Sequence, residues 1–332
     1  MITCLRTKNY NIMNFIPYPR VDKNLHHDLE SWRSNGTKAE GNWRSLKKYL
    51  ADNCKVTKSH ALTKCWYSEL HQGDNYVLDV EHFRPKNKAN PLKEKDVKII
   101  EKILGFPLLQ DEAQGHKYDW LEFDYRNYRI VTGFTNRGGA KHIYFPVFKG
   151  TRRLINNEKP WIEKEFPLFL DPVNRHDSSL LIVTPDGCIL PKTAKQQLNQ
   201  SDIDGLPHSW NNDAFDYTRA VVTIKMYRLD ETIFNQARKE FYDYMTEELD
   251  ILIMMINENV SKDLMKKSLE KISRSLLPSA QFSLASRCSL INYTPDSKYH
   301  IDVINIFNNA RRQIFDSIEN LINSFLIDWD KP

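Results

Sequence analysis

Residues 79–86 read DVEHFRPK, a run that brings carboxylates, an imidazole and two cations close together in sequence. A histidine with an unperturbed pKa near 6.5 can accept a proton from water at neutral pH, so His82 is a candidate general base. The neighbouring Glu81 carboxylate is a hard oxygen ligand of the kind that Mg²⁺ or Mn²⁺ prefers. The run therefore suits acid–base chemistry assisted by a divalent cation, provided that the rest of the chain supplies partners.

Two asparagines downstream are candidates for those partners. Asn127 follows His82 by 45 residues, and Asn136 follows Asn127 by nine, directly after Thr135, which can cap the start of a helix. In this order the acid, the histidine and the two asparagines resemble the HNH nuclease motif, the ββα-metal finger. The nine-residue step favours Asn136 as the closing metal ligand, and His142 is the alternative.

The HNH resemblance implies hydrolysis of a phosphodiester bond, and each position has a chemical reason. A divalent cation stabilises the negative charge that develops on the phosphate, and Glu81 and Asn136 would offer it oxygen ligands, which favours Mg²⁺ or Mn²⁺ over zinc. By the same resemblance, Asn127 hydrogen-bonds the loop backbone and holds the His82 ring in place. Nearby cations are expected to contact phosphate or oppose its developing charge; these are Arg84, Lys86, Arg137 and Lys141.

Strand geometry places a condition on this site. Neighbouring residues of a regular strand point to opposite faces, so Glu81 and His82 can share a site only if the chain leaves β geometry there. Pro85 favours such a break. Asp79 is expected to brace the strand, and the turn at Asp171 to support the site from outside.

Further blocks resemble one family more closely, the HNH subunit of Septu-type anti-phage systems (PtuB-like). The resemblance covers roughly residues 64–240 and implies a nuclease that works beside an ATPase partner, in some relatives within a retron-associated operon. The order of several blocks carries it, in addition to DVEHFRPK: KCWYSEL at 64–70, YDWLEFDYRNYR at 118–129, FP at 145–146, PLFLDP at 167–172 and RAVVTIKMYRLDET at 219–232.

The chain departs from many of these relatives at two pairs of cysteines that would bind a structural zinc. Here Cys65 remains, Ser68 replaces its mate, and Thr132 and Thr135 stand where the second pair would be. We therefore expect no structural zinc, with packing of Trp66, Tyr67, Trp120 and Tyr125 holding this region instead. The glycines at 138–139 cost roughly 2 kcal/mol of helix propensity, so a helix after Asn136 would begin late or be irregular.

Periodicity predicts an α+β protein in which the ββα-metal finger is embedded in a mostly helical chain. We expect an N-terminal helical segment at 1–64, the HNH core at 65–150 with a charged insertion at 87–117, a strand and loop extension at 151–214, and a helical region at 215–332. Within them we expect helices at 26–34, 41–52 and 93–104, strands at 76–82 and 127–132, a hairpin at 180–190, a helix capped by Asp230, and a last helix with an apolar stripe from Ile304 to Phe325.

Composition sets the broad class. A chain of 332 residues with 41% hydrophobic and 27% charged residues is typical of globular proteins, and a net charge of +4 permits contact with a polyanion. Five cysteines without a CxxC pair argue against a disulfide framework. No apolar run has the length of a signal peptide or membrane span, so we expect a cytoplasmic protein; residues 1–12 fit no pattern, which leaves Met13 as a second candidate start.

The sequence leaves the function open in two respects. The phosphate that an HNH site attacks is common to DNA and RNA, so the substrate is either nucleic acid, including a structured RNA such as tRNA. The alternative to a nuclease is a degenerate HNH-like adaptor that binds the ATPase or nucleic acid without turnover.

Overall fold

The computed structural model describes residues 23–35, 64–71, 78–137, 140–156, 158, 165–197, 212–278 and 280–324. The first described helix, α2 (Lys23–Asn35), contains the helix expected at 26–34. The helix expected at 41–52, the alternative start Met13, the glycines at 138–139 and the end of the last apolar stripe at Phe325 lie outside the described residues.

The two predicted arms of the hairpin pair with each other. Strand β1 (Leu78–His82) runs antiparallel to β2 (Tyr128–Thr132), and the register places Leu78 opposite Thr132 and His82 opposite Tyr128. All five residues of β2 are buried, which suits its β-branched and aromatic composition. The strands expected at 76–82 and 127–132 are therefore confirmed over their described residues.

A one-turn helix, α5 (Gly133–Asn136), follows β2 directly. The Thr132 side chain accepts a hydrogen bond from the Thr135 backbone N–H and so caps this helix. The expectation that Thr135 caps a helix starting at Asn136 is wrong, because the cap lies three residues earlier and Asn136 ends the turn.

The insertion between the two strands carries its own helix, α4 (Glu94–Leu104), close to the range expected from periodicity. Gly105 ends this helix in the left-handed conformation at φ 77°. The chain returns to β2 through two short 3₁₀ turns, η1 (Asp119–Leu121) and η2 (Tyr125–Asn127).

The extension forms a second two-stranded sheet. After the short helix α6 (Arg175–Ser178), strands β3 (Leu181–Val183) and β4 (Ile189–Pro191) pair antiparallel, as the hairpin at 180–190 predicts. Their turn lies against a neighbouring helix: Gly187 has φ 80°, and a Cβ there would sit 1.9 Å from the Asn235 carbonyl oxygen. Only glycine fits this close approach.

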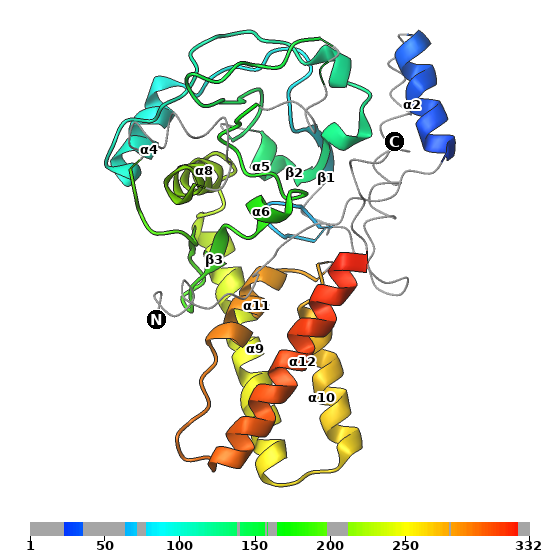
Figure 1. The fold of residues 1–332 in the computed structure, drawn as a ribbon, viewed down its shortest axis with the longest axis vertical. Coiled ribbons are helices and arrows are strands. Elements are labelled where there is room, and N and C mark those ends of the chain that lie inside the picture. The colour runs from blue at the N-terminus through cyan, green and yellow to red at the C-terminus, as the bar shows by residue number, and fades with distance from the viewer. Residues whose placement is uncertain are drawn as a thin grey trace.

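Helices dominate the rest of the chain. Helix α8 (Asp213–Met226) is buried on nearly all sides and lies among the loops and small sheets, whereas α9 (Thr232–Asn257), α10 (Lys262–Ser275), α11 (Ser283–Asn292) and α12 (Ile301–Ser324) pack together at one end of the molecule (Figure 1). The buried residues of α8 include the charged pair Asp216 and Arg219 as well as apolar side chains. Asp230 does not cap α9 as expected, because its carboxylate pairs with Lys225.

One cluster of buried apolar side chains joins these parts. It runs from Leu29 and Cys65 through both strands of the hairpin and α8 to Phe307 and Ile318 in α12. The combination of helices with two small antiparallel sheets confirms the α+β class. Over the described stretches, no helix has the length and apolarity needed to cross a membrane.

Candidate metal and catalytic site

Glu81 and Asn136, which are far apart in sequence, meet beside the hairpin. The Asn136 side-chain N–H donates to Glu81 Oε2 at 2.8 Å, and the other carboxylate oxygen, Oε1, pairs with the Lys141 ammonium. Lys141 also donates to the His82 carbonyl oxygen at 2.6 Å. Strand β1, helix α5 and the loop that follows α5 therefore converge on one carboxylate.

His82 is held by a backbone carbonyl. Its Nε2–H donates to the Glu122 oxygen at 2.9 Å, and its ring packs edge-on against Tyr128 with centroids 5.1 Å apart. Because Nε2 carries the proton, the lone pair of the neutral ring is on Nδ1. Burial lowers the pKa of His82 to about 4, although the Glu122 carbonyl and the Glu81 charge oppose this. The ring is therefore neutral at pH 7, and it is a weaker base than a free imidazole.

The expected break in the strand between Glu81 and His82 is wrong. Both residues pair with β2, Glu81 with Arg129 and His82 with Tyr128, and the bend begins at Phe83. Neighbouring strand residues point to opposite faces. In agreement with this, the Glu81 carboxylate contacts Asn136 and Lys141, whereas the His82 ring contacts Glu122 and Tyr128.

Asn127 clamps the loop that follows β1. Its Oδ1 accepts from the Arg84 backbone N–H at 2.9 Å, and its Nδ2–H donates to the Arg84 carbonyl at 3.0 Å and to that of Leu121 at 3.4 Å. The Asn127 side chain is buried, and its bonds to Arg84 are partly shielded from water. The expected contact with the loop backbone is confirmed, and the loop it fixes starts immediately after His82.

The four candidate phosphate contacts separate into two pairs. Two are used inside the protein: Arg84 donates to the buried Glu165 at 2.8 Å, and the Lys141 side chain is fully buried against Glu81. Phosphate contact by these two residues stays a prediction that would require a ligand to displace Glu165 or Glu81. Arg137 is 71% exposed and pairs with Asp79 at 2.5 Å.

Lys86, the fourth candidate, pairs with Glu122 at 2.6 Å and is 23% exposed. The Asp79 side chain makes this pair with Arg137, so both accessible cations are already bonded to acids. Phosphate contact stays a prediction for Arg137 and Lys86, where a ligand would have to compete with those carboxylates.

The positions of the missing cysteines come together. Cys65 Sγ lies 3.7 Å from Thr135 Oγ1 and 3.4 Å from the Ser68 backbone N, and the Thr132 and Thr135 hydroxyls are 3.2 Å apart. Ser68 Oγ is buried and has no hydrogen-bond partner. Small polar side chains from two turns thus fill one spot behind the hairpin, flanked by the buried aromatic residues Trp66 and Tyr67.

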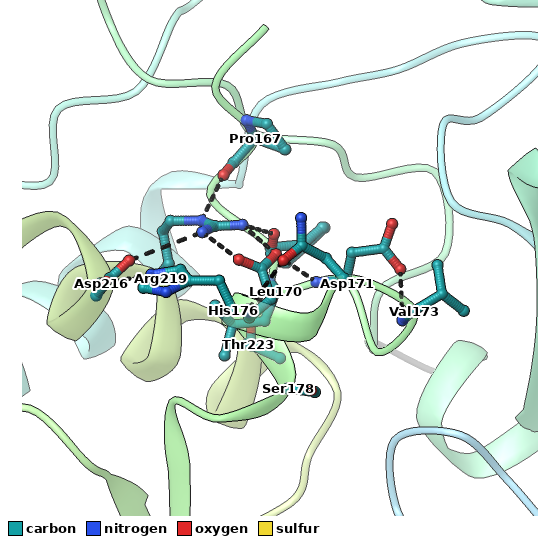
Figure 2. Close-up of polar contacts among 12 residues, drawn as sticks. Pro167, Leu170, Asp171, Val173, His176, Ser178, Asp216, Arg219 and Thr223 are labelled. Carbon is teal, nitrogen blue, oxygen red and sulfur yellow. Dashed lines mark hydrogen bonds and ion pairs between the residues drawn. The ribbon is translucent and has the colours of Figure 1, made fainter. Parts of the chain in front are cut away.

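A buried network supports β2 from outside, as the turn at Asp171 suggests. Arg129 of β2 donates to Asp171 at 2.7 and 2.5 Å, and the Asp171 backbone N–H donates to Asp177. Arg219 of α8 binds Asp177 through two nitrogens and also donates to the carbonyl oxygens of Pro167 and Phe169. Figure 2 shows the Arg219 guanidinium between Pro167 and Asp216, with Asp171 beyond it.

The residues around Glu81 fit a hard divalent cation in their donor chemistry. Asn136 Oδ1 is buried and has no hydrogen-bond partner, so an oxygen ligand next to the Glu81 carboxylate lacks a counterpart. Among the described residues, no three His, Cys, Asp or Glu side chains gather as a metal site. A cation here would therefore rely on one carboxylate, one amide and oxygens from outside the chain.

His142 stands apart from this set. Its side chain is exposed, and its backbone has a positive φ of 42° and donates from N–H to the Asn136 carbonyl at 2.9 Å. The side chain that reaches Glu81 is that of Asn136. This favours Asn136 over His142 as the closing ligand.

The sequence alone did not identify three residues that contribute to this site. Glu122 supplies the carbonyl that orients His82 and the carboxylate that binds Lys86, and Glu165 receives Arg84. No local pattern marks either glutamate. Tyr128 could have been found, because an antiparallel hairpin with His82 at one end places the residue after Asn127 opposite it.

Comparisons with known proteins do not extend this description. No protein-family model, no curated protein and no solved structure matches the chain.

Proposed function

We propose that the protein is a metal-dependent endonuclease of the HNH type that hydrolyses phosphodiester bonds in nucleic acid. One observation carries the proposal: the Asn136 side chain donates to the Glu81 carboxylate at 2.8 Å. The residue that follows Glu81 in β1 is His82, whose ring is neutral at pH 7. Sequence order alone does not require the contact between Glu81 and Asn136, since these two residues are 55 positions apart.

In this proposal Glu81 and Asn136 hold the cation through oxygen. Bound Mg²⁺ or Mn²⁺ would stabilise negative charge on the phosphate and on the departing oxygen. Asn136 would present its Oδ1 to the cation, which would give this buried oxygen a partner. Glu81 has lone pairs beyond those used by Lys141 and Asn136, since each carboxylate oxygen accepts more than one bond.

His82 acts as the general base. The Nε2–H bond to the Glu122 carbonyl fixes the tautomer, so Nδ1 is the atom that takes a proton from the attacking water. Asn127 positions this ring indirectly by holding the loop at Arg84. Glu81 and His82 point to opposite faces of an unbroken strand, so the condition for a shared site is not met within β1 itself. The proposal therefore requires the phosphate to reach both side chains around the end of β1, where the chain bends at Phe83.

Arg137 and Lys86 are the cations proposed to contact the phosphate backbone. Each is now paired with an acid, Asp79 or Glu122, and exchange of that acid for phosphate would retain the charge balance. The wider setting follows from the family resemblance: a cytoplasmic anti-phage system with an ATPase partner, acting on DNA or RNA, in some cases with retron components.

The experiment is a cleavage assay on the full chain, alone and with its ATPase partner, with Mg²⁺ or Mn²⁺ and both DNA and RNA. We expect His82→Ala to lower the rate at least 100-fold with the fold retained. His116→Ala is the matched control, because His116 also donates Nε2–H to a backbone carbonyl, that of Leu154, and packs edge-on against a tyrosine. Equal rates for the two variants would refute the role of His82.

A second candidate, the non-catalytic adaptor, also has an observation in its favour. Both Glu81 oxygens are bonded within the protein, and Glu81 and His82 contact different groups on a continuous strand. If Glu81→Ala, His82→Ala and Asn136→Ala each retained full anti-phage protection, binding without turnover would be the function.

A further inference from the structure

Lys141 is the most unusual residue of the candidate site. Its side chain has 0% exposure, and its ammonium contacts the Glu81 carboxylate and the His82 carbonyl oxygen at 2.6 Å. Burying an ammonium is costly unless a carboxylate and further acceptors surround it. Lys141 therefore neutralises Glu81 and ties the end of β1 to the loop after α5.

This arrangement determines where an added cation can go. The Lys141 ammonium pairs with Oε1 of Glu81, and the Asn136 side-chain N–H donates to Oε2 of Glu81. The side-chain oxygen of Asn136, Oδ1, has no hydrogen-bond partner. A divalent ion held by Glu81 and Asn136 would share one carboxylate with the ammonium. Like charges in a partly buried site repel more strongly than in water.

We propose that Lys141 is a resident cation of this site, a positioning residue that holds Glu81 when no metal is bound and weakens the affinity of the site for divalent metal. The inference rests on the proposed metal role of Glu81 and Asn136. It adds that the lysine keeps metal binding weak and reversible.

The test compares Lys141→Met and Lys141→Gln with the unmodified full chain. Glutamine is included because it removes the charge while keeping a hydrogen-bond donor for Glu81. The glutamine variant therefore tests the proposal even if the methionine variant fails to fold. Mg²⁺ and Mn²⁺ alone are the probes, and the readouts are the dissociation constant from calorimetry and the shift of Tm on adding metal. Neither readout depends on cleavage.

Lys64→Met is the matched control. Lys64 is the other lysine in the described ranges that is buried against a carboxylate, Glu69, at 2.8 Å, and it also donates to Ser283 and to the Ala280 carbonyl. Its removal should lower Tm in the same way as loss of Lys141. It should not change the response of Tm to metal, because Asn136 and Glu81 are untouched.

We expect both Lys141 variants to bind Mn²⁺ at least tenfold more tightly than the unmodified chain, and added metal to raise their Tm more than that of Lys64→Met. Unchanged metal affinity in both variants, in a chain that does bind Mn²⁺, would overturn the inference and leave the proposed nuclease standing. No metal binding in the unmodified chain and in both Lys141 variants would overturn both.

Discussion

At the residue scale, the Asn127 side-chain amide fixes the loop that follows β1. It forms bonds to both backbone groups of Arg84, and these groups would be left without their partner in Asn127→Ala. We expect this change to lower the free energy of unfolding by about 1–3 kcal/mol, as for other buried hydrogen bonds that lose one partner. Chemical denaturation measures the difference.

The matched control is Asn90→Ala, which removes an amide that accepts from the Gly115 N–H in an exposed loop. Its cost should stay below that of Asn127→Ala because water replaces the lost bond. If cleavage is observed, Asn127→Ala should also slow it, since the loop beside His82 loosens. An unfolding free energy equal to that of the control would contradict the clamp.

His176 gives a pH dependence at the same scale. Its hydrogen bond to Asp216, 2.7 Å long, raises the pKa of His176 above its usual value near 6.5. A pKa raised in the folded state adds stability that is fully present below the unfolded pKa and is lost as pH rises through the folded pKa. We expect His176→Gln to destabilise the protein more at pH 5.5 than at pH 9, as measured by urea unfolding at both values. Equal losses at the two pH values would show that the pair does not titrate in this way.

At the scale of elements, local patterns predicted what local interactions determine. Helix α4, strands β1 and β2 and the β3–β4 hairpin lie where periodicity and turn residues place them. The start of α5 was missed because two threonines compete for the cap and Thr132 makes the bond. Propensity does not distinguish two capping residues three positions apart.

The cluster of Cys65, Ser68, Thr132 and Thr135 can be tested by restoring cysteines at the three positions that lack them and measuring zinc binding. Four thiolates around zinc lie roughly 3.8 Å apart, given Zn–S bonds of about 2.3 Å in a tetrahedron. Cys65 Sγ and Thr135 Oγ1 are 3.7 Å apart. We therefore expect the triple variant Ser68→Cys/Thr132→Cys/Thr135→Cys to bind one zinc ion, detected by metal analysis and by thiolate-to-Co²⁺ absorption.

Two comparisons sharpen that expectation. Ser68→Cys alone provides two thiols and should bind zinc far more weakly. The triple variant without metal should be less stable than the unmodified chain, because Thr132 no longer caps α5 with its hydroxyl. A triple variant that retains no more zinc than Ser68→Cys would mean that the four positions do not form a tetrahedral set.

At the scale of the whole molecule, tertiary contacts determine which partner each charged residue has. Arg84 and Lys141 are cations near a candidate active site, and their sequence positions do not reveal that they pair with Glu165 and Glu81 in the fold. Glu165 is 81 residues from Arg84, and no pattern of neighbours encodes that contact. The order of Glu81, His82, Asn127 and Asn136 was readable, whereas the use of each charge depended on tertiary packing.

Arg219 joins the hairpin side of the molecule to α8, and its removal tests whether this connection stabilises the whole fold. In Arg219→Met the buried Asp177 would lose its cation, and the carbonyl oxygens of Pro167 and Phe169 would lose a donor. Breaking a buried ion pair by removing one partner costs about 3–5 kcal/mol. We expect a loss of that size in the free energy of unfolding.

A double variant separates the effect of the lost charge from the effect of the lost packing. Asp177→Asn combined with Arg219→Met removes both charges of the Arg219–Asp177 pair, so the double variant should lose less than the sum of the two single losses. Lys239→Met is the surface control: Lys239 pairs with Asp243 one helical turn away, both about half exposed, and should cost less than about 1 kcal/mol. An Arg219→Met loss no larger than this control would mean that water or a local rearrangement satisfies Asp177, and that the contacts of Arg219 do not stabilise the whole fold.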